Sequence, residues 1–84
     1  TIPRLRQIEN CENILREKGF RQFRVRYHNE IARIEVGEDE IQGFFEKDTR
    51  DYIAERFKEN GFTYITVDIQ GYRTGSMNQL LTKS

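Results

Sequence analysis

The segment FRQFRVRYHNEIARIEV, residues 20–36, contains two runs in which apolar and polar side chains alternate. Alternation with a period of two is typical of a strand with one buried face. We therefore predict strands over residues 20–28 and 31–36. Asn29 lies between them and tolerates the left-handed backbone conformation that a tight turn requires. The two strands are therefore predicted to pair antiparallel as a hairpin.

A helix is predicted on each side of this hairpin, over residues 3–18 and 46–60. Each has a stripe of side chains on one helical face. The stripes are Leu5, Ile8, Cys11 and Leu15 in the first helix and Tyr52, Ile53, Arg56 and Phe57 in the second. Thr1 can cap the first helix. A glycine followed by phenylalanine ends both helices, at Gly19 and at Gly61.

The remaining segments connect and complete these elements. The acidic segment 37–43 is predicted to be a turn, with Phe44 and Phe45 packing beneath the start of the second helix. Residues 63–70 alternate again and predict a third strand. The side chains expected on its buried face are Thr63, Ile65, Val67 and Ile69. The order α-β-β-α-β predicts an α+β fold, a two-layer sandwich with both helices on one face of the sheet.

Length and composition set limits on function. With 84 residues the chain is one small domain, and its early helical pattern after Thr1 suggests a piece of a longer protein. Fourteen basic residues balance fourteen acidic ones, which argues against a nucleic-acid binder. No apolar run reaches the ~20 residues of a membrane span. A single cysteine fits a reducing, cytoplasmic setting.

The polar face of the hairpin carries Arg24, Arg26, Arg33 and Glu35. Two registers are possible. If Val25 pairs with Ala32, Arg24 lies opposite Arg33. If Val25 pairs with Ile34, Arg26 lies opposite Arg33. Opposed like charges are unfavourable on a sheet, and a bound phosphate or carboxylate would remove the conflict. The alternative is a solvated polar face on which Glu35 neutralises one arginine.

Other candidate residues lie outside this face. Glu12 lies beside the apolar stripe of the first helix, where a carboxylate needs a partner. The candidates are an arginine of the hairpin, a hard cation shared with Glu35, or water. The loop of residues 71–76 could wrap a phosphate with its backbone amides, Arg73 and the hydroxyl of Ser76. Cys11 is predicted to pack in the core and His28 to be exposed.

Four strings carry a resemblance over residues 5–80 to a known family. They are Gly19-Phe20-Arg21-Gln22-Phe23-Arg24-Val25-Arg26, Ala32-Arg33-Ile34-Glu35-Val36, Val67-Asp68-Ile69-Gln70-Gly71-Tyr72-Arg73 and Thr74-Gly75-Ser76-Met77-Asn78. In this order and spacing they resemble the C-terminal region of the LarE-type ATP-dependent sacrificial sulfur transferases. These enzymes belong to the PP-loop ATP pyrophosphatase superfamily and are also described as ExsB-like.

The resemblance implies a function that the residue pattern alone does not. Full-length relatives carry an N-terminal PP-loop domain that uses ATP and Mg to adenylate a carboxylate of a nicotinic-acid-derived nucleotide. Sulfur is then delivered toward a nickel-pincer cofactor, in some members from a cysteine of the enzyme. The C-terminal region of these relatives looks like the C-terminal dimerisation domain of GMP synthetase. This likeness implies a homo-oligomer and contacts with the N-terminal domain.

The resemblance also implies roles for residues of this chain. Arg24, Arg26 and Arg73 match family arginines that hold the substrate phosphate or carboxylate, and Ser76 lies in the same loop. Glu12 and Glu35 match acidic positions that bind a divalent metal. The matching region has no phosphate loop, and the donor cysteine of the family lies upstream, so Cys11 is not its equivalent.

We therefore expect a single C-terminal domain, residues 1–84, that binds the substrate anion and takes part in assembly but has no activity alone. The alternative is an oligomerisation domain without a direct catalytic role. A KH-like nucleic-acid module ranks third, because the chain lacks the Gly-x-x-Gly clamp between helices.

Overall fold

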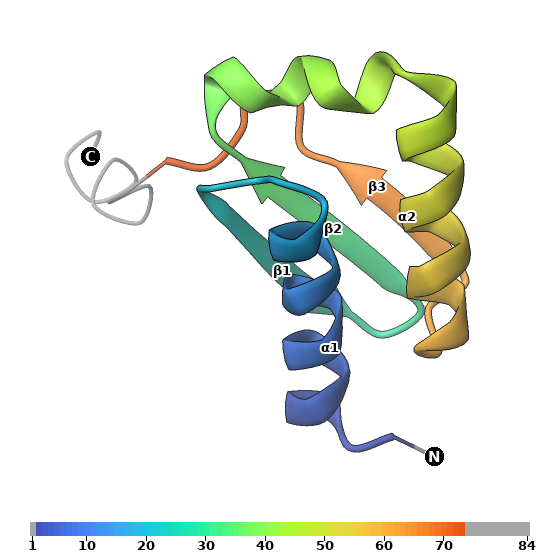
Figure 1. Cartoon of the computed structure of the whole chain (residues 1–84). Coiled ribbons are helices and arrows are strands. Elements are labelled where there is room, and N and C mark those ends of the chain that lie inside the picture. Colours follow the sequence, from blue (N-terminus) through green and yellow to red (C-terminus); the bar gives the residue numbers. More distant parts are fainter. Residues whose placement is uncertain (1, 74–84) are drawn as a thin grey trace, which may run out of the picture.

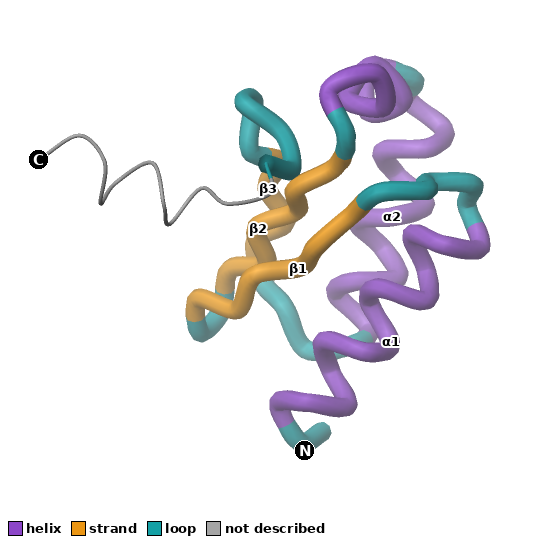
Figure 2. Tube along the Cα trace, turned by 90° about the vertical axis from the view of Figure 1, so that its left-hand side faces the viewer, coloured by secondary structure: helices purple, strands orange, loops and turns teal. Residues whose placement is uncertain are grey.

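The computed structural model describes residues 2–73 as one three-stranded sheet with helices on one of its faces (Figures 1 and 2). The elements are α1 (Arg4–Glu17), β1 (Phe23–His28), β2 (Ile31–Val36), the 3-10 helix η1 (Glu38–Phe45), α2 (Lys47–Glu59) and β3 (Tyr64–Val67). In the sheet order β1-β2-β3, β1 is antiparallel and β3 is parallel to β2. The predicted α+β fold with both helices on one face is confirmed. No described helix covers the other face, which we call the open face.

The hairpin has one of the two predicted registers. Val25 lies opposite Ile34, so Arg26 lies opposite Arg33. Asn29 has a φ of 57° and makes the left-handed turn. The first strand begins at Phe23 instead of residue 20.

The reason for the later start of β1 lies in η1, where we predicted only a turn. The Glu40 carboxylate accepts hydrogen bonds from the backbone amides of Arg21 and Gln22, at 2.7 and 3.0 Å. Asp39 also forms an ion pair with Arg21 at 2.9 Å. The backbone amides of Arg21 and Gln22 therefore bind η1 and do not join the sheet. Phe20 turns inward and stacks on Phe44, with ring centroids 4.9 Å apart.

The core lies between the helices and the sheet, and several of the positions expected in it are exposed instead, among them Tyr52, Arg56 and Thr63. The buried apolar residues are Cys11, Leu15, Phe20, Val25, Ala32, Ile34, Val36, Phe44, Ile53, Phe57 and Phe62. Leu5 is 81% exposed because the first turn of α1 projects beyond the end of the sheet (Figure 1). Phe45 and Ile69 are also exposed. Of the two adjacent phenylalanines only Phe44 is buried, and Ile69 lies beyond the end of β3 at Val67.

The two glycine–phenylalanine pairs end their helices in the same way. Gly19 and Gly61 have φ values of 103° and 101°. The amide of Phe20 donates to the carbonyl of Leu15, and that of Phe62 donates to the carbonyl of Phe57. This is the Schellman arrangement, in which a left-handed residue lets the chain reverse and the next side chain enter the core.

Alanine at these two glycines is expected to destabilise the fold by different amounts. Gly19→Ala adds only left-handed backbone strain, about 1–2 kcal/mol, because no atom lies within 4 Å of its added Cβ. In Gly61→Ala the Cβ would lie 3.0 Å from Nε2 of Gln7, which donates to the carbonyl of Asn60. Urea unfolding should therefore show about 1 kcal/mol more loss for Gly61→Ala. Equal losses would contradict this difference.

None of the helices within residues 2–73 is both long and apolar enough to cross a membrane.

Candidate functional site: an arginine cluster on the open face

Three arginines and one glutamate lie together on the open face of β1 and β2. Arg24 lies opposite Glu35, and Arg26 lies opposite Arg33. Side chains of directly opposed residues are neighbours on one face of a sheet. The predicted meeting of two guanidinium groups is therefore confirmed for Arg26 and Arg33, and Arg24 lies two residues away on the same face.

Glu35 forms ion pairs with two of these arginines. Its side chain is only 10% exposed, and its carboxylate lies 3.4 Å from Nε of Arg26 and 3.1 Å from Nη2 of Arg33. Nε of Arg26 and Nε of Arg33 are nevertheless buried without a hydrogen-bond partner in the structure. One negative charge therefore faces two positive ones and two N–H donors have no acceptor, so the cluster keeps an excess of positive charge.

Arg24 differs from its neighbours because its contact is with an aromatic ring. Its guanidinium lies 5.7 Å from the centroid of the Tyr72 ring. Within residues 2–73, no carboxylate lies within ion-pair distance of Arg24. The Arg24 side chain is exposed and thus combines solvent access with an unneutralised charge. The sequence pattern does not single out Tyr72, since only the folded chain brings its ring near β1.

The predicted glycine loop lies partly outside the described residues. Arg73 is exposed, and its Nη2 donates to Oε1 of Gln70 at 3.2 Å. Arg73 directly follows Tyr72, and the ring of Tyr72 contacts the guanidinium of Arg24 in the arginine cluster. Ser76 lies outside the described residues, and its predicted role remains a prediction.

Glu12 has a partner that we did not expect. Its Oε2 accepts a hydrogen bond from the backbone amide of Val25 at 3.2 Å. Val25 belongs to β1, an edge strand, so the carboxylate fills an unpaired donor at the free edge of the sheet. Among the described residues the carboxylate of Glu12 therefore pairs with a backbone amide, and not with an arginine of the hairpin.

The described residues do not fit the divalent metal that the resemblance implies. A hard cation such as Mg²⁺ or Ca²⁺ requires several oxygen ligands. Both oxygens of Glu35 face guanidinium groups, and Glu12 is bonded to the backbone. No group of three or more possible metal-ligating side chains exists among residues 2–73. We therefore assign no metal-dependent role to these residues.

Cys11 is completely buried, as predicted, and His28 is exposed. Burial, with a smaller contribution from Glu12, raises the pKa of the Cys11 thiol to about 12. Because the thiolate is the nucleophile, we expect no alkylation of folded protein by iodoacetamide at pH 8 and rapid alkylation in urea. Reaction of the folded chain as fast as the unfolded one would contradict this assignment.

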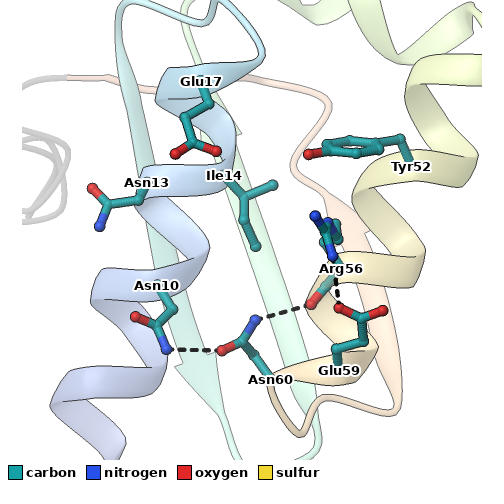
Figure 3. A pocket seen from close by; sticks show the side chains of 8 residues that line it. All are labelled: Asn10, Asn13, Ile14, Glu17, Tyr52, Arg56, Glu59 and Asn60. Atoms are coloured by element: carbon teal, nitrogen blue, oxygen red, sulfur yellow. Dashed lines mark hydrogen bonds and ion pairs between the residues drawn. The ribbon is translucent and has the colours of Figure 1, made fainter.

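A concave region lies between α1 and α2, away from the arginine cluster (Figure 3). The amide of Asn60 joins the helices, accepting from Asn10 at 2.9 Å and donating to the carbonyl of Arg56 at 3.0 Å. Arg56 itself pairs with Glu59. Since these polar groups satisfy one another, the region holds the helices together and we assign it no ligand.

The fold and the arginine cluster together define a small α+β domain with a cationic open face. No family model matches the chain. The chain is 40% identical over all of its 84 residues to the pyridinium-3,5-bisthiocarboxylic acid mononucleotide synthase of Lactiplantibacillus plantarum. It is 36% identical over 83 residues to an uncharacterized protein of Synechocystis. These matches confirm the resemblance to LarE-type proteins along the whole chain.

The chain is much shorter than these relatives. It spans 30% of the synthase and 31% of the Synechocystis protein. It therefore corresponds to less than a third of the length of each relative.

Proposed function

We propose that this domain binds an anionic group of the substrate in a LarE-like, ATP-dependent sulfur transferase of the cytoplasm. The substrate class would be a nicotinic-acid-derived nucleotide on the route to a nickel-pincer cofactor, as the family resemblance implies. The similar synthase is named for a pyridinium mononucleotide with two thiocarboxylic acid groups. ATP and Mg would act on another domain, because this chain contains no Ser-Gly-Gly-x-Asp-Ser loop.

The observation that carries the proposal is the unneutralised charge of Arg24 beside Arg26 and Arg33. A guanidinium group presents several N–H donors in one plane, a geometry that matches phosphate and carboxylate. Arg24 would make the first contact with the anion, and Arg26 and Arg33 would strengthen it through their excess charge. Arg73 would approach from the adjoining loop.

The test is a calorimetric titration of the 84-residue chain with inorganic pyrophosphate, with sodium chloride of equal ionic strength as control. We expect saturable binding to one site. An absence of heat beyond that of the salt control would contradict the proposal.

An assembly role is the second candidate, and the free edge of β3 favours it. β3 is an edge strand, and an apolar groove beside it is lined by Phe44, Phe45, Ile65 and Val67. The other edge is partly closed, because Glu12 binds the amide of Val25. Light scattering with Phe45→Glu as the disrupting variant would test this role. A dimer that ignores pyrophosphate would favour assembly alone.

A further inference from the structure

The segment after β3 folds back across the end of β2. The amide of Asp68 donates to the carbonyl of Ile34 at 2.8 Å, and the amide of Tyr72 donates to the carbonyl of Val36 at 2.6 Å. Between them, the Asp68 carboxylate accepts from the amide of Gln70 at 2.9 Å, and the Asp68 carbonyl accepts from the amide of Gly71 at 3.0 Å. Four hydrogen bonds therefore fix the backbone that carries Tyr72.

Gly71 makes this crossing possible. It is buried and has a φ of 79°, in the left-handed region that favours glycine. A Cβ at this position would lie 2.7 Å from the carbonyl oxygen of Val36 and 3.2 Å from Cδ1 of Ile41. Both the backbone conformation and the limited space thus require glycine at this position. The turn at Gly71 places the side chain of Tyr72 against Arg24.

Contact with an aromatic face restrains a guanidinium without consuming its hydrogen-bonding capacity. The ring attracts the cation through its negative face, so the N–H groups of Arg24 remain available. A long exposed side chain otherwise loses conformational entropy when it binds a ligand. Arg24 held by Tyr72, at 5.7 Å, would lose less of it.

We propose that Tyr72 is a positioning residue, which holds the Arg24 guanidinium in place to receive the anion. This inference rests on the proposed anion-binding function and assigns Tyr72 no contact with the reacting atoms. The hydroxyl is not needed, so Tyr72→Phe should bind pyrophosphate as the unmodified chain does. Tyr72→Leu should bind about 3- to 10-fold more weakly.

The decisive comparison is a double-mutant cycle in the calorimetric titration. If Tyr72 acts through Arg24, Tyr72→Leu should have no further effect in a chain that already carries Arg24→Ala. Tyr64→Leu is the matched control, because Tyr64 is an exposed tyrosine of β3 on the sheet. It should leave the affinity unchanged.

A measurement on the unmodified chain keeps the inference testable if a variant fails to fold. The ring current of Tyr72 should shift the side-chain NMR signals of Arg24 upfield. Absence of this shift, or independent effects of Tyr72→Leu and Arg24→Ala, would overturn the positioning role alone. No binding by the unmodified chain would instead overturn the proposed function.

Discussion

Arg24→Ala is expected to lower the affinity for pyrophosphate about 10- to 100-fold. A hydrogen bond to a charged group contributes about 1.5–3 kcal/mol, and each 1.4 kcal/mol corresponds to a factor of ten in affinity. The Arg24 side chain is exposed and makes no ion pair within residues 2–73, so its removal should leave the fold intact. Calorimetric titration and thermal unfolding would measure the two effects separately.

The matched control for this substitution is Arg6→Ala. Arg6 is an exposed arginine of α1, on the helical side of the sheet. Its substitution by alanine removes the same charge as Arg24→Ala. Equal losses of affinity in the two variants would show that overall charge, rather than the open face, attracts the anion. In a full-length protein that contains the PP-loop domain, Arg24→Ala should abolish turnover, and unchanged turnover would refute its role.

Glu35→Gln is expected to change stability and anion affinity in opposite directions. It removes the carboxylate that lies between Arg26 and Arg33, so the two guanidinium groups repel each other without compensation. Breaking a fully buried pair costs about 3–5 kcal/mol. These arginine side chains are 39% and 42% exposed, so solvent screening reduces the expected loss to about 1–2 kcal/mol.

The same substitution should strengthen pyrophosphate binding several-fold, because the anion then replaces the missing negative charge. Saturating pyrophosphate should therefore recover much of the lost melting temperature in Glu35→Gln, since a ligand stabilises the state that binds it. Glu55→Gln, at an exposed position of α2, is the control and should change neither quantity. Weaker binding by Glu35→Gln would contradict the assigned role of the carboxylate.

The sequence pattern predicts the elements of this fold because most of them depend on local signals. Alternation defines the hairpin, Asn29 its turn, and Gly19 and Gly61 the helix ends. The 3-10 helix escaped prediction because its stabilising contacts come from a distance: Glu40 binds amides 18 and 19 residues away. Leu5 and Ile69 follow the apolar periodicity but lie beyond the ends of the sheet, which periodicity cannot reveal.

The candidate site was predictable in its charges but not in its contacts. Alternation alone places Arg24, Arg26 and Glu35 on one face and limits the register to two alternatives. The double pairing of Glu35 depends on side-chain conformations, and the contact of Tyr72 with Arg24 depends on a chain reversal at Gly71. Neither is encoded in local spacing.

The most direct test of the account is an NMR titration of the ¹⁵N-labelled chain with pyrophosphate, read residue by residue. We predict that the signals that shift most belong to Arg24, Arg26, Arg33, Glu35 and Tyr72, and that those of α1 and α2 stay in place. Largest shifts in the region between α1 and α2, or no saturable shifts on the open face, would contradict the claim that this face binds an anion.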